Sequence, residues 1–229
     1  ATLNLALQAA KAGVKRFIFI SSIKVNGEST EVGKPFRPDD KFIPIDPYAL
    51  SKYEAEVGLR KIAQDTAMEV VIIRPPMVYG PYVKGNFASL LKWVSKGVPL
   101  PLGGIKNNKR SVISIDNLVD FINIAIEHPN AANQTFLVSD GESLSTTALL
   151  NRIVEAFNVP NRLLPVPVSW FEIISKLSCR PEIYQRLCGS LEADISKTKE
   201  LLGWAPRHSV VESLKITVDA FVNDLNKKK

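Results

Sequence analysis

A tyrosine and a lysine stand four residues apart in the stretch Tyr-Ala-Leu-Ser-Lys, at Tyr48 and Lys52. If this stretch is helical, both side chains lie on one face, because about 3.6 residues per turn bring positions i and i+4 together. A phenol is a poor base near neutral pH, but a nearby ammonium favours the phenolate. The pair could therefore move a proton to or from a hydroxyl group. The same spacing is common on helix surfaces without any function, so its surroundings must decide.

Two serines, Ser21 and Ser22, directly follow the apolar run of residues 17–20. Such a run is typical of a strand buried on both faces of a sheet. Ligands of open parallel sheets bind outside the carboxyl ends of the strands, so hydroxyls at this position are expected at a site. The alternative is ordinary capping of the strand end. With Tyr48 and Lys52 downstream, we favour Ser22, Tyr48 and Lys52 as a catalytic group.

The elements around these residues predict an alternating α/β fold. An amphipathic helix is expected at Thr2–Ala12, ended by Gly13, before the strand at Lys15–Ser21. A loop rich in Gly, Pro and charge leads to a helix over Pro47–Thr66 and to a second buried strand, Val70–Arg74. Because parallel strands need a crossover of about a dozen residues or more, the intervening helix implies a parallel sheet.

The rest of the chain predicts the end of this sheet and a helical lobe. Further elements are expected in this order: a helix near Phe87–Lys96, a strand at Ser111–Ile115, a helix opened by Asp116, a strand at Gln134–Val138, and mainly helices from Ser145 onward. We predict a partial Rossmann-like, doubly wound parallel sheet in residues 1–145, with interleaved substrate-binding segments. Residues 146–229 are expected to form a small, mainly helical substrate-binding lobe.

Composition excludes several classes of protein. The net charge of +6 is spread over scattered Lys and Arg residues, with one run at Lys227–Lys229, which favours a solvated surface over nucleic-acid binding. Cys179 and Cys188 have no metal-ligand spacing, which predicts free thiols, no zinc site and a reducing compartment, the cytoplasm. There is neither an apolar stretch long enough to span a membrane nor a signal-peptide pattern.

Several motifs in chain order resemble the extended short-chain dehydrogenases/reductases, the NAD-dependent epimerase/dehydratase family, whose members act on nucleotide sugars. The resemblance covers nearly the whole chain. It rests on the strand and loop at 17–27, Tyr48 with Lys52, the stretch Arg74–Pro81, the triplet Gly85-Asn86-Phe87, the stretch Arg110–Val112 with Asp116 and Asn117, and a C-terminal signature between Ala193 and Pro206.

This resemblance implies roles for individual residues. Binding of NAD or NADP is expected of Ser21, Tyr48, Lys52, Pro75 and Met77, and contacts to a UDP-sugar substrate are expected of Ser22, Asn86, Arg110 and Arg186. Guanidinium groups bind phosphate oxygens in pairs, and an amide can donate and accept at a base, so the substrate set suits a nucleotide diphosphate. Singly, each could instead be a surface strand residue, a helix-face charge or a helix cap.

The sequence also departs from the family. The Gly-rich turn that holds the cofactor pyrophosphate is not among these residues, and Ala1 aligns within the helix before the family's fourth strand, so the choice between NAD and NADP is open. We expect residues 1–229 alone to bind NAD(H) poorly and to self-associate through an apolar strand edge. Ile23 and Lys24 replace the Asp-Glu pair of sugar dehydratases, and Met77 stands where many 4-epimerases have Asn.

Three functions remain open at this point. The first is a UDP-sugar 4-epimerase-like enzyme that works by hydride transfer through a 4-keto intermediate. The second is an NAD(P)H-dependent reductase of a UDP-4-keto-6-deoxy sugar in surface polysaccharide synthesis, which residues 137–147 and 186–191 resemble. The third is a non-catalytic remnant. By resemblance, the full-length protein is expected to be a homodimer formed through the helices at Ala1–Ala12 and Pro47–Thr66.

Overall fold

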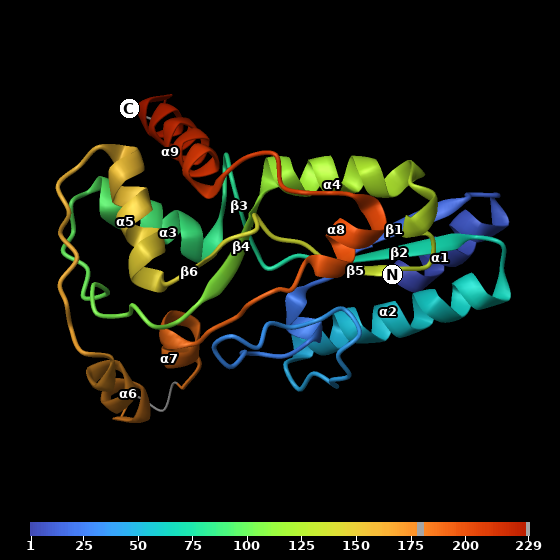
Figure 1. The fold of residues 1–229 in the computed structure, drawn as a ribbon, viewed down its shortest axis with the longest axis horizontal. Coiled ribbons are helices and arrows are strands. Elements are labelled where there is room, and N and C mark those ends of the chain that lie inside the picture. Colours follow the sequence, from blue (N-terminus) through green and yellow to red (C-terminus); the bar gives the residue numbers. More distant parts are fainter. Residues whose placement is uncertain (178–180, 228–229) are drawn as a thin grey trace.

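Three parallel strands form the sheet that carries the predicted catalytic group (Figure 1). In this computed structural model, which describes residues 1–177 and 181–227, β1 (Arg16–Ile20) pairs with β2 (Glu69–Arg74). β2 in turn pairs with β5 (Thr135–Leu137), which gives the order β1-β2-β5. The parallel strand-helix-strand unit predicted from the sequence is therefore confirmed.

Helices cover both faces of this sheet. Helices α1 (Thr2–Lys11) and α2 (Pro47–Asp65) pack on the face to which Val70 and Ile72 point. The alternate residues of β2, Val71 and Ile73, point to the other face and pack under α4 (Ile115–Glu127). Successive strand residues point to opposite faces, so a strand covered on both sides is apolar throughout. The doubly wound α/β class is confirmed.

A second small sheet extends the fold. β3 (Met77–Tyr79) runs parallel to β4 (Arg110–Ser114), and β4 pairs antiparallel with β6 (Ser143–Leu144). β4 corresponds to the strand predicted at Ser111–Ile115, but the element expected next after Arg74 was a helix, and no strand was expected at β6. Strands of three and two residues are too short to show an alternating pattern, so only the pairing with β4 reveals them.

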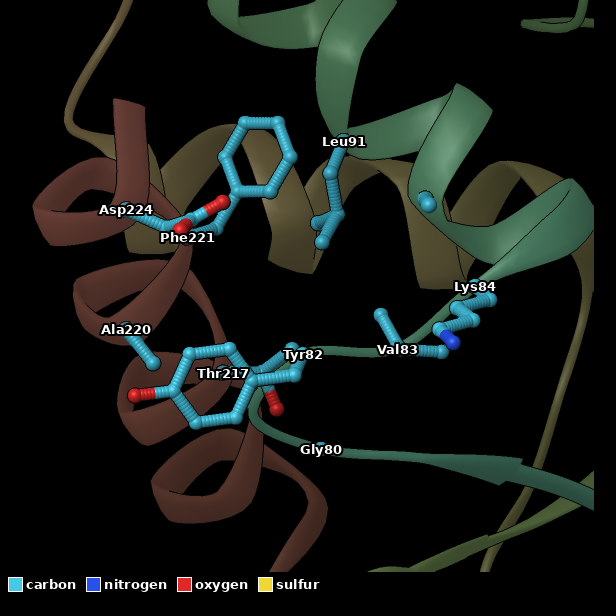
Figure 2. Close-up of a pocket in the computed structure, with 10 residues that line it drawn as sticks. Gly80, Tyr82, Val83, Lys84, Leu91, Thr217, Ala220, Phe221 and Asp224 are labelled. Carbon is cyan, nitrogen blue, oxygen red and sulfur yellow. The ribbon is translucent and has the colours of Figure 1, made fainter. Parts of the chain in front are cut away.

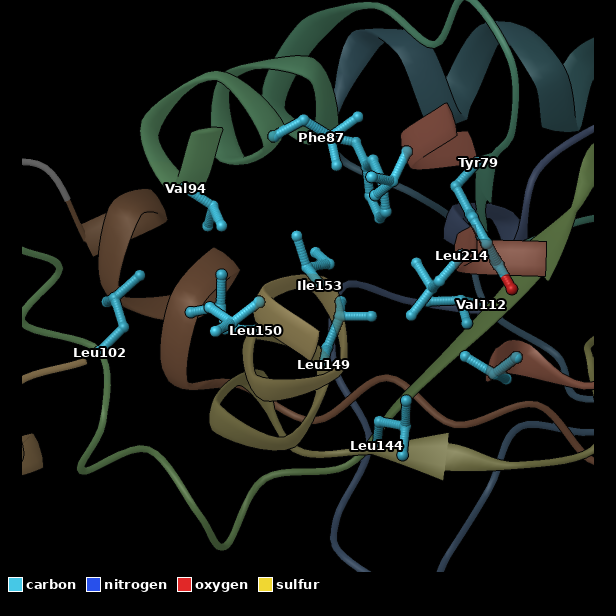
Figure 3. Close-up of a cluster of buried hydrophobic side chains, with 14 of the residues drawn as sticks. Tyr79, Phe87, Val94, Leu102, Val112, Leu144, Leu149, Leu150, Ile153 and Leu214 are labelled. Atoms are coloured by element: carbon cyan, nitrogen blue, oxygen red, sulfur yellow. The ribbon is translucent and has the colours of Figure 1, made fainter. Parts of the chain in front are cut away.

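The second sheet carries its own apolar core (Figure 3). Helices α3 (Gly85–Ser95), α5 (Thr146–Phe157) and α9 (Val210–Lys227) contribute to it. Among its fully buried side chains, Leu91 comes from α3 and Leu150 from α5. This packing fixes α3 relative to the second sheet and to α5.

The predicted helical character of the C-terminal third is confirmed. Besides α5 and α9, it contains α6 (Val168–Leu177), α7 (Pro181–Cys188) and α8 (Ser196–Leu202). The core under α4 also takes in Leu202 of α8 and Trp204, so this third contributes to both layers. The domain boundary at residue 145 stays a prediction.

Local signals explain where the helix beside the site begins. The Asp46 carboxylate accepts a hydrogen bond from the Ala49 amide at 3.0 Å, and Pro47 occupies the first helical position.

Of the two cysteines, Cys188 is a half-buried free thiol whose pKa is raised by burial, and Cys179 lies outside the described residues. Within residues 1–177 and 181–227, we find no helix with the length and apolar character of a membrane span.

Candidate active site

The predicted serines lie at the carboxyl end of β1. The Ser21 amide donates to the Ile73 carbonyl at 2.7 Å and continues the pairing with β2. The Ser22 hydroxyl caps a short 3-10 helix, Ile23–Val25, by accepting from the Lys24 amide at 3.3 Å. One residue on, the Ile23 amide donates to the Pro75 carbonyl at 3.0 Å. Ser22 is thus held beside Pro75, so the expected catalytic loop and the expected cofactor loop are neighbours.

Lys52 reaches the same strand end from α2. Its ammonium donates to the Ile20 carbonyl at 3.0 Å and lies 4.9 Å from the centre of the Phe19 ring. Tyr48 stands one turn earlier, in the first turn of α2, and its side chain is 53% exposed. The structure therefore brings Lys52 and Ser22 to one edge of the sheet, with Tyr48 at the solvent side of that edge. Their joint catalytic role stays a prediction.

An ion pair links the loop after Ser22 to the start of α2. The Lys24 ammonium lies 3.7 Å from the Asp46 carboxylate that caps α2, and 3.2 Å from Glu28. Both contacts are partly exposed, so they contribute little to stability. They nevertheless tie the two segments that carry Ser22 and Tyr48.

A buried carboxylate that the sequence analysis missed lies beneath the predicted group. Glu56 is fully buried, and its two oxygens accept from Ser21 Oγ at 2.6 Å and from the Arg74 guanidinium at 2.9 and 2.6 Å. The half-exposed Arg60 donates to the same carboxylate at 2.9 Å. Burial raises the pKa of Glu56, but the hydrogen bonds and positive charge of Arg74, aided by Ser21 and Arg60, outweigh burial and hold it below its usual value. Glu56 is therefore an ionised group inside the fold.

Arg74 connects this carboxylate to two loops. Its remaining guanidinium nitrogen donates to the Asn26 side chain at 3.0 Å and to the Pro38 carbonyl at 3.1 Å. The amide of Asn26 in turn donates to the Arg37 carbonyl at 2.7 Å. One signal could have found this network: Glu56 follows Lys52 at the same helical spacing at which Lys52 follows Tyr48.

The other residues expected to bind cofactor sit at the junction of the two sheets. Pro75 is buried directly after β2. Met77 opens β3, pairs with Val112 and is half-buried against the second core. Both follow the carboxyl end of β2, the edge at which ligands of parallel sheets bind.

The residues expected to bind substrate come from the second layer. Arg110, at the start of β4, donates to the Gly189 carbonyl at 3.1 Å, and burial lowers its pKa without removing its charge. Arg186 is exposed in the last turn of α7, three residues before Gly189. Both arginines therefore belong to one neighbourhood, and their contact with a diphosphate stays a prediction.

Asn86 is exposed in the first turn of α3. The N-cap position belongs to Lys84, and no side chain caps this helix end, so Asn86 is not the helix cap considered in the sequence analysis. Uncapped amides at a helix start favour anions. This agrees with the expected contact to a nucleotide, which stays a prediction.

A second buried network, also missed from the sequence, joins the two sheets. The Tyr79 hydroxyl donates to Asp140 at 2.7 Å, and the same carboxylate accepts from the Ser114 amide at 3.0 and 3.1 Å and from the Asn117 side chain at 2.8 Å. Burial raises the pKa of Asp140, although these hydrogen bonds oppose it. Burial, with the adjacent Asp140 charge and hydrogen bond, also raises the pKa of Tyr79. Tyr79 is therefore a neutral structural donor.

A cavity of about 380 Å³ has none of the predicted catalytic residues in its lining. Figure 2 shows the side chains that surround it. It is formed between the loop leading to α3, with Tyr82 and Lys84, and α9, with Phe221. A larger groove of about 820 Å³ runs beside α2 and includes Tyr53, Arg60 and Arg74 in its lining. Neither cavity is lined by Ser22, Tyr48 or Lys52, so these cavities do not define the predicted site.

A parallel sheet wound by helices on both faces, with serine and lysine at its carboxyl edge and tyrosine one turn away, defines a Rossmann-like protein of the dehydrogenase/reductase type. A family model, the NAD dependent epimerase/dehydratase family, matches residues 1–139. A UDP-glucose 4-epimerase of Vibrio cholerae is 54% identical over 226 residues, which cover 99% of this chain and 69% of that protein. The chain belongs to the NAD-dependent epimerase/dehydratase family.

Solved structures agree with this assignment. UDP-glucose 4-epimerase from Thermotoga maritima, crystallised with UDP-glucose, is 25% identical with a TM-score of 0.75, over 98% of this chain and 69% of that one. UDP-glucuronic acid 4-epimerase from Bacillus cereus, in complex with NAD, shares the fold at 22% identity and a TM-score of 0.78, over 97% of this chain and 66% of that one. The chain thus spans about two thirds of the length of these proteins.

Proposed function

We propose that the protein containing this chain is an NAD-dependent UDP-sugar 4-epimerase that interconverts UDP-glucose and UDP-galactose. The observation that carries the proposal is that Lys52 and Ser22 both lie at the carboxyl end of β1, and that Tyr48 precedes Lys52 by one turn of α2. The name of the 54% identical relative supports this substrate and favours epimerisation over the one-way reductase considered from the sequence.

In this mechanism the side chains of the chain handle the proton and the developing negative charge. Tyr48, as phenolate, takes the proton of the sugar C4 hydroxyl, and Ser22 donates a hydrogen bond to the same oxygen. The 4-keto sugar then turns over in the site, and Tyr48 returns the proton after the opposite face of C4 has been reduced. NAD, when bound, supplies the chemistry of accepting and returning the C4 hydride.

The residues present fit a nicotinamide ribose at this edge. An ammonium has three donors, and Lys52 spends one on the Ile20 carbonyl, so the others can hold ribose hydroxyls. Pro75 and Met77 lie at the end of the adjacent strand, where the nicotinamide ring would rest.

The nucleotide half of the substrate is assigned to the second layer. We place the diphosphate between Arg110, which binds the Gly189 carbonyl, and Arg186, which precedes Gly189 by three residues. We place the uracil near Asn86 at the start of α3. Paired guanidinium groups match the geometry of phosphate oxygens. With its phosphate charges neutralised by the two arginines, the nucleotide would stay in place while the 4-keto sugar turns over.

The proposal is tested with the complete natural polypeptide and its bound cofactor. We expect interconversion of UDP-glucose and UDP-galactose, followed by chromatography of the two sugars, without net consumption of added NADH or NADPH. Stoichiometric oxidation of NADPH on a UDP-4-keto-6-deoxy sugar, with no interconversion, would instead establish the reductase.

We also propose a homodimer formed through α1 and α2, in a cytoplasmic setting. Its support is a set of apolar side chains on α1 that remain exposed, Leu3, Leu5 and Leu7. Monomeric proteins usually keep exposed apolar patches small. Light scattering of the complete protein should give twice the chain mass, and Leu5→Arg with Leu7→Arg should give the monomer. Ile126→Arg, which changes a similarly exposed residue on α4, is the matched control.

A further inference from the structure

We infer that Glu56 is a positioning residue of the active site: together with Ser21 and Arg74, it sets the place of Tyr48 and Lys52 relative to Ser22. The inference rests on the proposed function, since it concerns the same site. Glu56 is fully buried, so it does not touch the substrate or the cofactor itself.

Two successive turns of α2 are bonded to the end of β1. Lys52 donates to the Ile20 carbonyl at 3.0 Å, and one turn later Glu56 accepts from Ser21 Oγ at 2.6 Å. Two contacts at adjacent residues of the strand fix both the rotation of the helix and its slide along the strand. Tyr48 lies on the same face of α2, one turn before Lys52. The two contacts therefore place it beyond the end of β1, on the side of Ser22.

The Glu56 carboxylate is also anchored from the neighbouring strand, β2. Arg74, the last residue of β2, binds both oxygens of Glu56 in a bidentate pair with distances of 2.9 and 2.6 Å. Such a pair is both strong and directional. The Glu56 carboxylate is therefore held in one orientation, and α2 is bonded to the ends of both β1 and β2.

The same guanidinium also holds the segment after Ser22. Arg74 donates to Asn26, which directly follows the 3-10 helix capped by Ser22, and to the Pro38 carbonyl. The residue after Arg74 is Pro75, whose carbonyl binds the Ile23 amide. The segments that bear Ser22, the expected nicotinamide contact and the Tyr48 helix therefore converge on one buried ion pair.

The bonds that hold α2 in place matter because the rate of proton transfer depends steeply on distance. A misplacement of about 1 Å can cost about a hundredfold in rate. Tyr48 is half-exposed in the first turn of its helix, where side-chain packing restrains it little. Its position depends on how α2 is held, and Glu56 is the charged residue among the buried residues of that helix.

The test compares three variants in the complete protein with its cofactor: Glu56→Gln, Ser21→Ala and Arg60→Gln. Glu56→Gln keeps the shape but replaces an acceptor with a donor facing Arg74, whereas Ser21→Ala removes the hydroxyl that links Glu56 to the end of β1. Arg60→Gln is the matched control, because Arg60 binds the same carboxylate from the half-exposed side and also donates to Thr135 at 3.0 Å.

We expect Glu56→Gln and Ser21→Ala to lower kcat by about 10- to 100-fold while KM for UDP-glucose changes less than about threefold. They should also shift the pH profile of kcat, because the geometry of Tyr48 and Lys52 has changed. Within the pH range in which the variants stay folded, a purely structural role would lower kcat by the same factor at every pH. Arg60→Gln should keep the wild-type kcat and pH profile.

Amide hydrogen exchange gives a readout that needs no substrate. Residues 47–52 and 22–26 should exchange faster in Ser21→Ala than in wild type or Arg60→Gln. If the wild-type protein interconverts no UDP-sugars, the proposed function fails, and this exchange pattern still decides the positioning role. If Glu56→Gln does not fold, Ser21→Ala decides it. Wild-type pH profile and exchange in Ser21→Ala and in any folded Glu56→Gln would overturn the inference.

Discussion

Tyr48, Lys52 and Glu56 follow one another on successive turns of α2, yet their surroundings differ. Tyr48 meets solvent, Lys52 touches the strand end, and Glu56 lies inside the fold. Tyr48 and the remaining donors of Lys52 can thus be reached by a ligand, whereas Glu56 cannot. A buried Glu56 that holds the helix, together with an exposed Tyr48 expected to react, suits a preorganised site.

Removal of the Tyr48 hydroxyl should abolish most of the activity. We expect Tyr48→Phe to lower kcat by about 10²- to 10⁴-fold, the range of a lost general acid or base, with a similar KM for UDP-glucose. Steady-state kinetics of the complete protein measures this. The matched control is Tyr53→Phe, since Tyr53 is a second tyrosine on α2 that lines the groove beside Arg60. Equal activity of the two variants would remove Tyr48 from the mechanism.

The Glu56 ion pair should leave a signature in acid stability. Because the pKa of Glu56 is lower in the folded state, its contribution to the free energy of unfolding is full above about pH 4.3 and is lost as the pH falls through the folded value. Near pH 7, Glu56→Gln leaves Arg74 buried without a negative partner and should cost about 3–5 kcal/mol. Urea unfolding between pH 7 and pH 3 should show this difference shrinking with acid. A difference that stays constant with pH would mean that Glu56 is not charged in the fold.

At the scale of elements, β4 carries Arg110 to the segment after α7. Arg110→Lys keeps the charge but loses the planar fork, so KM for UDP-glucose should rise about tenfold or more while kcat falls little. Lys109→Gln is the control, because the Lys109 side chain is exposed and its contacts to Ser190 and Leu191 are made by the backbone. A lowered kcat with unchanged KM for Arg110→Lys would place Arg110 with the reacting atoms instead.

The elements also show how far the sequence could predict the fold and the site. β1, α2 and β2 have long apolar or amphipathic patterns, so their order and parallel pairing follow from sequence alone. The partners of Glu56 come from β1, β2 and α2, and that meeting depends on the register Ile20↔Ile73, which no local pattern specifies. Asp140 and Tyr79 meet through the pairing of a strand only three residues long.

The whole molecule is held together where its two sheets meet. The Asp140 carboxylate binds Tyr79 of β3, the Ser114 amide of β4 and the Asn117 side chain of α4. The Asn117 amide also donates to the His208 carbonyl at 2.8 Å, just before α9. The layer expected to hold the nucleotide is therefore fixed to the layer expected to hold the catalytic group, which favours a rigid connection between the two layers over a hinge.

The strand arrangement also predicts how residues 1–229 behave when prepared alone. β1 is an edge of the sheet, and because the Ser21 amide faces β2, the backbone groups of Ile18 and Ile20 face away from it. An apolar edge strand is a template for pairing with another chain. We expect light scattering to show species larger than a dimer that grow with concentration, and calorimetry to show weak NAD binding.

A single substitution tests whether the β1 edge is the cause. Ile20→Pro removes an outward amide donor and keeps the carbonyl that Lys52 binds, so it should reduce the large species, because proline on an edge blocks further pairing without breaking the existing ladder. Ile126→Lys changes an exposed apolar residue on α4 and should leave them unchanged. A monodisperse monomer with micromolar affinity for NAD would show that this edge needs no partner, since neither pairing with another chain nor a further strand would then be required for a working cofactor site.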